Sequence, residues 1–220
     1  MTFSQLFDHT NLRPYATDAD MKNLCEEAMK YNFKTVAINN ANIEKCVRFL
    51  KGSGVLVDAA VSFPLGQCTL DTKIFEAQDA IKKGAGEVDY VINIAELKNK
   101  NYAYIEQEMK ALVQICRENN VISKVIFENC YLEDGEIIEL CRIANKYKPD
   151  YIKTSTGFGT SGATVKDVQL MRKHALPEIG IKAAGGIRDL ATVNKMLAAG
   201  ATRIGCSSSV QIMEEKRQEQ

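Results

Sequence analysis

The segment IGIKAAGGIRDLATVNKMLAAGATRIGCS (179–207) decides the fold class of this chain. It contains an apolar run over 179–185, an amphipathic stretch over 189–199 and a second apolar run over 203–207. Asp189 can cap the amphipathic stretch as a helix, and Gly200 follows it in the way that glycines follow helix ends. The segment therefore predicts a strand, a helix and a second strand parallel to the first.

The same alternation extends along the rest of the chain. Strand-like runs lie at 6–10, 35–39, 55–63, 88–94, 124–130, 151–155, 179–185 and 203–207. Helical patterns follow them at 18–31, 42–51, 71–83, 101–119, 134–147, 164–175, 189–199 and 209–217. Eight such units in 220 residues favour an α/β fold with parallel strands, a (β/α)8 TIM barrel forming a single domain over 1–220. An open doubly wound sheet is the alternative.

The composition excludes several classes of function. The 28 basic side chains balance the 28 acidic ones, which argues against a nucleic-acid partner but not against a small anionic substrate. Without an apolar run of about 18 residues or a signal-peptide pattern, we expect no contact with a membrane. The seven irregularly spaced cysteines suit reduced thiols and a cytoplasmic location. The two histidines argue against a histidine-based metal site, so the chemistry falls mainly to Lys, Asp, Glu, Ser, Thr or Cys.

Two lysines stand inside neighbouring apolar strands. Lys153 follows Tyr151 and Ile152 in one strand, and Lys182 has the same relation to the next. If both point into the barrel at the same height, each ammonium group disfavours the charge of the other, and burial adds to this effect. One of them would then be a neutral amine near pH 7, as a Schiff-base nucleophile must be. The alternative is that each lysine extends outward from a strand end.

Polar side chains in other strands extend this candidate site. Asp89 lies between Val88 and Tyr90, where an inward carboxylate could move a proton at a substrate carbon or form a structural ion pair with a lysine. Asp8 and Thr10 share one face of the first strand and are candidate substrate contacts, or a simple turn cap. The sequence assigns no role to Asn39, Asp58 or Glu128, which also lie in or at the end of strands.

Glycine-rich strand ends late in the chain indicate a phosphate site. They are TSTGFGTSG (154–162), AGGIRD (184–189) and GCSSS (205–209). Barrels of this class often bind phosphate after the seventh and eighth strands, through backbone N–H groups and hydroxyls. Each segment alone could simply end a strand. We assign Thr156 to substrate contact, and these residues to phosphate binding: Gly157, Gly185, Gly186, Gly205, Ser207 and Ser208.

Seven segments together resemble one enzyme family. They are DHTNLRP (8–14), SFPLG (62–66), EVDYVIN (87–93), KVIFENC (124–130), YIKTSTGFGTSGAT (151–164), IKAAGGIRD (181–189) and ATRIGCSSS (201–209). Over essentially its full length the chain resembles the deoxyribose-phosphate aldolase family. The combination of KTSTGF with a downstream K-A-x-G-G-[IV]-R is the most specific part of that resemblance.

The resemblance implies a metal-independent class I aldolase on a (β/α)8 barrel, acting without a cofactor. Such enzymes reversibly cleave 2-deoxy-D-ribose 5-phosphate to D-glyceraldehyde 3-phosphate and acetaldehyde. It implies that Lys153 forms the Schiff base, that Lys182 and Asp89 transfer protons, and that the family's D-x-T, here Asp8 and Thr10, contacts substrate hydroxyls. One departure is Ala37, at a second-strand position where many members have a cysteine. That cysteine is not a catalytic group, so the expected activity stands.

Other activities remain as alternatives. A sugar-phosphate isomerase on the same barrel would use a carboxylate base without a Schiff-base lysine, and a non-catalytic sensor would bind the sugar phosphate without turnover. A metal-dependent aldolase is disfavoured by the shortage of histidine. The sequence leaves the oligomeric state open, although a homodimer is plausible for such a barrel. It also leaves open the range of aldehydes accepted.

Overall fold

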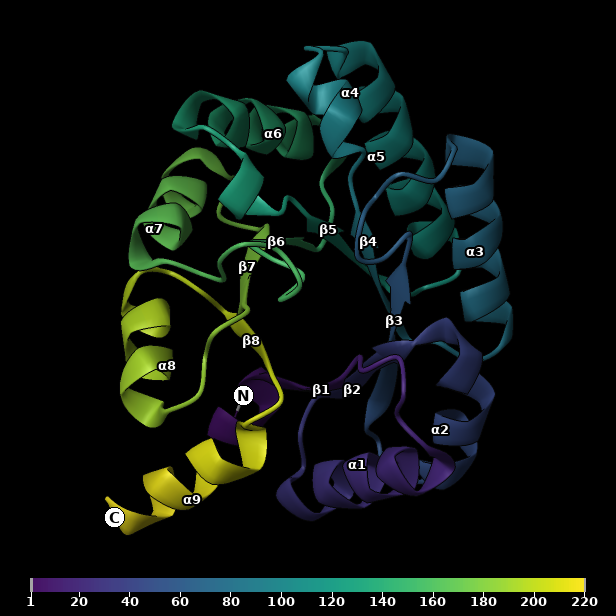
Figure 1. Cartoon of the computed structure of the whole chain (residues 1–220), viewed down its shortest axis with the longest axis vertical. Coiled ribbons are helices and arrows are strands. Elements are labelled where there is room, and N and C mark those ends of the chain that lie inside the picture. Colours follow the sequence, from purple (N-terminus) through teal and green to yellow (C-terminus); the bar gives the residue numbers. More distant parts are fainter. Residues whose placement is uncertain (1, 220) are drawn as a thin grey trace.

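The computed structural model describes residues 2–219, in which eight parallel strands close into a barrel in the order of the chain (Figure 1). The strands are β1 (Phe7–Asn11), β2 (Thr35–Asn39), β3 (Leu56–Val61), β4 (Glu87–Val91), β5 (Ile122–Ile126), β6 (Tyr151–Lys153), β7 (Gly180–Ala184) and β8 (Arg203–Cys206). β8 pairs with β1, and this pairing closes the sheet. The fold is therefore the predicted TIM barrel, and the open sheet is excluded.

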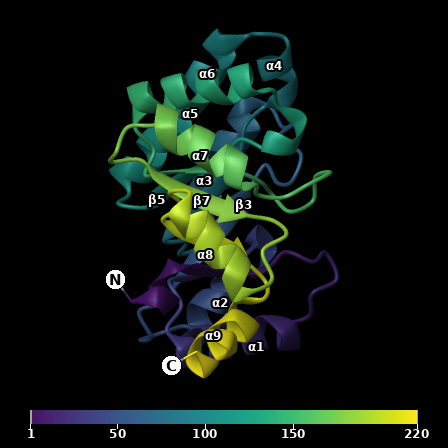
Figure 2. The same cartoon turned by 90° about the vertical axis from the view of Figure 1, so that its left-hand side faces the viewer.

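Helices follow the strands and form the outer layer. They are α1 (Asp18–Tyr31), α2 (Ile43–Phe49), α3 (Leu70–Lys82), α5 (Tyr102–Glu118), α6 (Asp134–Tyr147), α7 (Val165–His174), α8 (Leu190–Ala198) and α9 (Ser209–Gln218). The structure adds α4 (Ile94–Lys98) and the 3-10 turns η1 (Phe3–Leu6), η2 (Asn40–Asn42) and η3 (Asn129–Tyr131). Figure 2 shows α7, α8 and α9 following one another along the outside of the barrel. None of the helices within residues 2–219 has the length and apolar character needed to cross a membrane.

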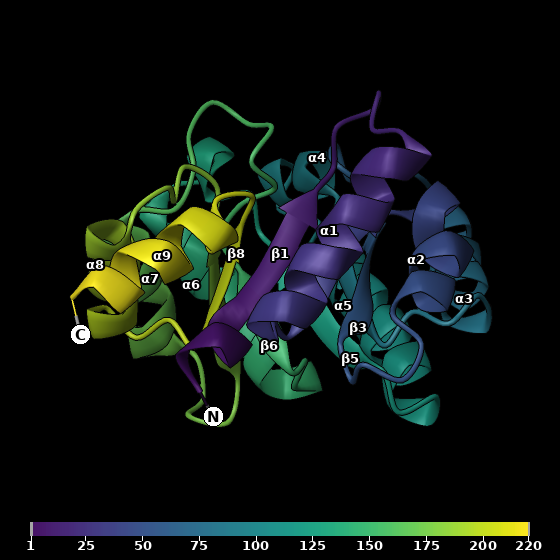
Figure 3. The ribbon, with the colours of Figure 1, turned by 90° about the horizontal axis from the view of Figure 1, so that it is seen from below.

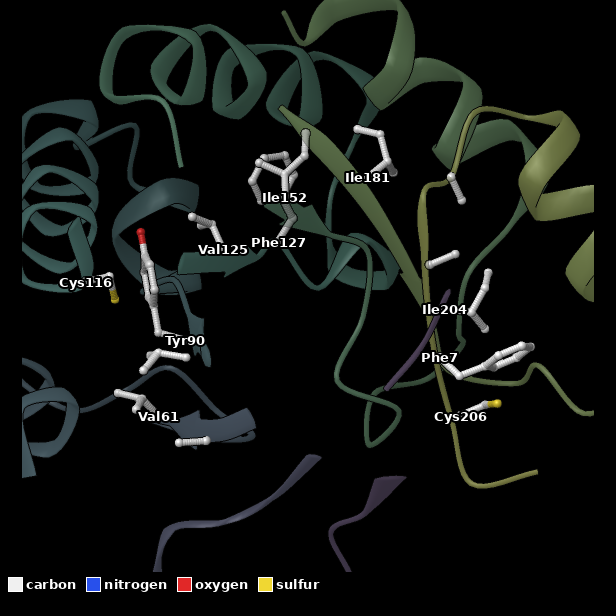
Figure 4. Packing of buried hydrophobic residues seen from close by; sticks show 14 of the residues in the cluster. Phe7, Val61, Tyr90, Cys116, Val125, Phe127, Ile152, Ile181, Ile204 and Cys206 are labelled. Atoms are coloured by element: carbon white, nitrogen blue, oxygen red, sulfur yellow. The ribbon is translucent and has the colours of Figure 1, made fainter. Parts of the chain in front are cut away.

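Alternation along each strand separates an apolar outer face from a polar inner face. The outer side chains, such as Phe7, Tyr90, Ile152 and Ile204, are buried against the helices (Figure 4). In Figure 4, Tyr90 of β4 lies beside Cys116 of α5. Because successive side chains point to opposite faces, the residues next to these in sequence point into the barrel. The hydrophobic core thus lies between sheet and helices, and the barrel interior is left for charged groups.

Several expected boundaries differ from the observed ones. The predicted strand over 88–94 ends at Val91, because Asn93 accepts a hydrogen bond from Glu96 N–H and caps α4. The predicted strand over 124–130 ends at Ile126, and Glu128 has a left-handed backbone with φ of 58°. Such a conformation cannot continue a strand.

The sequence pattern predicts Asp18, Asp71 and Asp189 as the N-caps of three helices, and the first two of these predictions are wrong. Thr17 rather than Asp18 caps α1, and Thr69 rather than Asp71 caps α3, since each threonine hydroxyl accepts from an N–H of the first turn. Asp189 caps α8 through Thr192 N–H, as expected. In both wrong cases the aspartate lies inside the first helical turn, where its negative charge interacts favourably with the helix dipole.

The carboxyl ends of the strands face one end of the barrel. The β1–α1 loop and the β6–α7 loop project from that end, at the top of Figure 3. Active sites of TIM barrels form at this end, because it carries the loops that follow the strands. The polar residues predicted after β6, β7 and β8 therefore lie together at this end of the barrel.

Candidate active site

Lys153 and Lys182 lie side by side inside the barrel, paired in register on β6 and β7. Both ammonium nitrogens contact the same oxygen of Asp89, Oδ2, at 2.6 Å. The predicted inward orientation and matching height of the two lysines are confirmed. The three residues form one hydrogen-bonded group at the centre of the barrel.

This group belongs to a larger buried cluster. Within residues 2–219 the cluster joins four carboxylates and four cations, none more than 4 % exposed: Asp8, Asp58, Glu87, Asp89, Lys124, Lys153, Lys182 and Arg203. The sequence reasoning missed Lys124, Glu87 and Arg203. Lys124 and Arg203 each begin an apolar run, a position where a charged residue usually just opens a strand. Their charge inside buried strands was the signal that could have found them.

The electrostatic surroundings distinguish the two lysines. Burial lowers the pKa of Lys153, the Asp89 carboxylate opposes this change, and the Lys182 ammonium lowers the pKa further. Burial alone would also lower the pKa of Lys182, but Asp58, Asp8 and Asp89 together hold it above the ordinary value. Lys153 is therefore the lysine that more readily becomes a neutral amine, while Lys182 stays an ammonium ion.

A cavity of about 570 Å³ opens above the cluster at the carboxyl end of the barrel. Of the four cluster cations, Lys153 is the one that lines it. The predicted site residues that also line it are Thr10, Thr156, Gly157, Gly185, Gly186, Gly205 and Ser207. Two arginines that the sequence reasoning did not select, Arg13 and Arg188, line the cavity too and supply positive charge.

Four predicted site residues lie outside the cavity wall. Lys182 and Asp89 lie in the buried cluster beneath Lys153. Asp8 is fully buried, where it contacts Lys182 Nζ at 2.6 Å and Arg203 Nη1 at 2.7 Å. Ser208 is the residue before α9, next to Ser207 in the wall. In this structure Asp8 therefore holds the cations of the cluster rather than facing the cavity.

Glycines in the cavity wall and next to it allow neighbouring groups to pack closely. A Cβ on Gly205 would lie 3.0 Å from Cε of Lys182, so the missing side chain leaves room for that lysine. A Cβ on Gly162 would lie 2.1 Å from the carbonyl oxygen of Gly185, so the two loops can touch only through glycine. Gly186 has φ of 76° and open space around its Cα, on the cavity side.

Glu128 holds the loop that follows β6. Its buried carboxylate accepts hydrogen bonds from Thr156 N–H, at 3.0 Å, and from the Thr156 hydroxyl. The Thr156 oxygen in turn accepts from Phe158 N–H at 3.0 Å. That hydroxyl thus donates to one protein group and accepts from another. Thr156 therefore helps to fix the wall of the cavity.

Asn39, at the end of β2, donates a hydrogen bond to the carbonyl of Leu12 and so helps to fix the β1–α1 loop.

One acidic group has a spacing that could hold a metal ion. Oxygens of Asp8, Asp58 and Glu87 lie within 4.8 Å of one another. Protein cations already occupy this space, because Lys124 Nζ lies 2.8 Å from Asp58 and from Glu87, and Arg203 binds Asp8 and Glu87. The three carboxylates are neutralised by these side chains, so their geometry gives no support to a metal centre.

Known proteins with related sequences share this architecture. The sequence profile of the DeoC/LacD family aldolases matches residues 2–214. The chain is 56% identical over 210 residues to a deoxyribose-phosphate aldolase of Lactobacillus acidophilus, covering 96% of this chain and 89% of that protein. It is 52% identical to one of Bacteroides thetaiotaomicron, covering 95% and 88%. A tetrameric deoxyribose phosphate aldolase of Aeropyrum pernix superposes with a TM-score of 0.91 at 30% identity, covering 99% and 92%. The chain therefore belongs to the DeoC/LacD family of aldolases.

Proposed function

We propose that this protein is a class I aldolase that reversibly cleaves 2-deoxy-D-ribose 5-phosphate to D-glyceraldehyde 3-phosphate and acetaldehyde. The observation that carries the proposal is Lys153, a buried lysine with a lowered pKa that lines the cavity. Such an amine is suited to attack an aldehyde and form a Schiff base. The relatives named deoxyribose-phosphate aldolase support this choice of substrate.

The reaction begins when neutral Lys153 attacks the C1 aldehyde of the open-chain sugar and water leaves, giving an iminium ion. A base then removes the proton from the C3 hydroxyl, the C2–C3 bond breaks, and its electron pair flows into the iminium to give an enamine. Glyceraldehyde 3-phosphate departs at this stage. Protonation of the enamine at C2 and hydrolysis then release acetaldehyde and regenerate the lysine.

The proposed mechanism assigns these proton transfers to Asp89 and Lys182. Asp89 contacts both lysines, and Lys182 keeps its charge beside Lys153. In the proposed mechanism Asp89 and Lys182, acting with water, exchange protons at the C3 hydroxyl and at C2. The charge of Lys182 also favours the neutral form of Lys153. Thr10 lies on the cavity wall, where it would contact the hydroxyls of the sugar.

The phosphate group would occupy the side of the cavity formed after β7 and β8. Gly185, Gly186 and Ser207 line this side, and the N-terminus of α9 begins two residues after Ser207. Backbone N–H groups and a helix N-terminus favour a phosphate without a net basic charge on the protein. Gly157, Gly205 and Ser208 complete the proposed set. Arg188, in the same loop as Gly185 and Gly186, adds a cation. Held there, the phosphate orients the reacting carbons toward Lys153.

Replacing Glu128 with alanine is expected to raise the KM for 2-deoxyribose 5-phosphate about tenfold, because Thr156 loses the acceptor of its N–H and hydroxyl and the loop at Gly157 loses its fixed position. The rate of iminium formation with acetaldehyde, which carries no phosphate, should change little. Steady-state kinetics with the sugar phosphate and with unphosphorylated 2-deoxyribose make the comparison. An equal loss with both sugars would contradict the proposed role of the loop in binding phosphate.

Trapping with borohydride tests the proposed function directly. Acetaldehyde and borohydride should add a reduced two-carbon group to Lys153, which mass spectrometry of the digested protein locates. The same trap in the presence of a chelator should give the same product. Binding of sugar phosphate without trapping or turnover would instead indicate a sensor, and isomerisation without trapping would indicate a carboxylate-based isomerase. Label on another lysine would contradict the assignment of Lys153.

We also propose that the enzyme acts in the cytoplasm, as a single domain that self-associates. The seven cysteines are free thiols, which suits the reducing cytoplasm. Residues 1–220 would act as one aldolase domain. Self-association, as a homodimer at least, is in keeping with the tetrameric Aeropyrum pernix enzyme.

A further inference from the structure

The balanced charges of the buried cluster that contains Lys153 limit how this lysine can lose its proton. When all eight groups are ionised, the four carboxylates balance the four cations: Asp8, Asp58, Glu87 and Asp89 against Lys124, Lys153, Lys182 and Arg203. Lys153 must lose a proton before it can attack an aldehyde. If that proton went to solvent, the cluster would keep an uncompensated negative charge in a region that is at most 4 % exposed. The loss is easier if the proton stays inside the cluster.

We propose that Asp58, a carboxylate outside the cavity wall, stores the proton that Lys153 releases and returns it when the carbinolamine loses water. This inference rests on the Schiff-base function proposed for Lys153. It gives a role in the reaction to a residue that does not contact the substrate.

A continuous path of contacts joins the two residues. Lys153 Nζ lies 2.6 Å from Asp89 Oδ2, and the same oxygen lies 2.6 Å from Lys182 Nζ. Lys182 Nζ lies 2.9 Å from Asp58 Oδ2. Lys153 gives a proton to Asp89 while Lys182 gives one to Asp58, and Asp89 then restores the proton of Lys182. The net result is one proton moved from Lys153 to Asp58.

Asp58 is the carboxylate of this path best suited to hold a proton. Asp89 lies 2.6 Å from each of three ammonium groups, which hold its pKa well below the ordinary value against the effect of burial. Asp58 contacts two ammonium groups, those of Lys124 and Lys182, and both lie closer to Asp89. Burial, and then the negative charge of Asp89, raise the pKa of Asp58 to about 7.

The other neighbours of Asp58 add to this preference. Asp8 from β1 and Glu87 from β4 place further carboxylate oxygens within 4.8 Å. Its register partner on β2 is the uncharged Ala37, and Arg203 on β8 binds Asp8 and Glu87 rather than Asp58. Like charges at this spacing favour a shared proton.

The protons balance over the formation of the iminium. Lys153 as the ammonium ion passes one proton to the Asp58 carboxylate, which gives a neutral amine and a neutral acid. The amine adds to the aldehyde to form a carbinolamine. The stored proton then joins the departing hydroxyl as water, which leaves a positive iminium and a negative Asp58. The cluster begins and ends with balanced charge, and no proton enters or leaves the protein.

Replacing Asp58 with asparagine, which keeps the shape of the acid but cannot exchange its proton, tests the proposal. Timed borohydride quenching with acetaldehyde gives the rate of iminium formation against pH. The plateau rate should fall about tenfold or more because the departing hydroxyl lacks its proton. On the plateau of the unaltered enzyme Lys153 and Asp58 share one proton, whereas in the variant Lys153 must release its proton to solvent, so the pH midpoint should not fall. The surface substitution Glu106→Gln is the matched control and should leave both quantities unchanged.

The possible outcomes separate this inference from the proposed function. A lowered midpoint with an unchanged plateau rate would overturn the storage of a proton and leave a charge effect alone. Labelling of Lys153 in the unaltered enzyme tests the aldolase chemistry whatever Asp58 does. Should the asparagine variant fail to fold, infrared difference spectra of the unaltered enzyme take its place. They should show a protonated carboxyl band that diminishes when acetaldehyde forms the iminium, and a constant band would overturn the proposal.

Discussion

A Lys153→Ala variant is expected to lose aldolase turnover by a factor of about 10⁴ or more, since removing one member of a catalytic unit has effects of this order. The amine of Lys153 supplies the bond to the substrate, and none of the other cluster cations lines the cavity within residues 2–219. No other lysine can therefore replace it at the substrate. Turnover is measured as glyceraldehyde 3-phosphate formed, in an assay coupled to its oxidation.

The same variant should still fold and bind the sugar phosphate. Its cluster loses one cation, and the contact between Asp89 and Lys182 remains. Circular dichroism and ligand-dependent thermal shift provide the control, and borohydride trapping should yield no labelled lysine. Normal turnover in this variant would contradict the Schiff-base mechanism altogether.

A Lys182→Leu variant is expected to lose both stability and activity, but in a way that differs from the loss of Lys153. Lys182 contacts three carboxylates, Asp8, Asp58 and Asp89, within 2.9 Å. Removing one partner of a buried ion pair leaves uncompensated charge and costs about 3–5 kcal/mol. The free energy of unfolding, measured with denaturant, should fall by that amount relative to the unaltered protein.

The activity of this variant should also depend differently on pH. The Lys182 ammonium lowers the pKa of Lys153, and the Asp89 carboxylate raises it. Burial still lowers the pKa of Lys153, but without Lys182 the Asp89 carboxylate is opposed by one effect fewer, so the pKa rises and the neutral amine forms only at higher pH. The alkaline shift should be visible in the rate of iminium formation. Lys182→Arg, which keeps a cation, should show a smaller shift; equal profiles for both variants would show that the charge of Lys182 does not set the pKa of Lys153.

Much of the fold could be predicted because the barrel is built from a repeated local pattern. Each strand shows an apolar run and each helix an amphipathic period, so the order of elements follows from the chain itself. Boundaries were less predictable where side chains decide them, as at Asn93, which caps α4, and Glu128, whose backbone ends β5. These local contacts depend on neighbours that the periodicity does not reveal.

The candidate site was predictable where the chain repeats a feature at the same place. Lys153 and Lys182 occupy matching positions in successive units, so their register on β6 and β7 could be expected. For Asp8, the alternation of side chains along β1 predicted the inner face correctly but could not predict how deep in the barrel the carboxylate lies. The structure shows its carboxylate bound to Lys182 and Arg203, and the substrate contact expected of it stays a prediction. Thr156 likewise directs its hydroxyl to Glu128.

The sequence by itself determined that this chain alternates strands and helices, that lysines occupy matching positions in two neighbouring strands, and that glycines follow the late strands. These properties depend on residues near one another in the chain. Only the tertiary structure decided that Asp58 meets Lys182, 124 positions away, and that Arg203 meets Asp8, 195 positions away. The reason is physical: closing the barrel sets which strands face each other across its interior and at what height. The charges that tune Lys153 come from strands far apart in sequence.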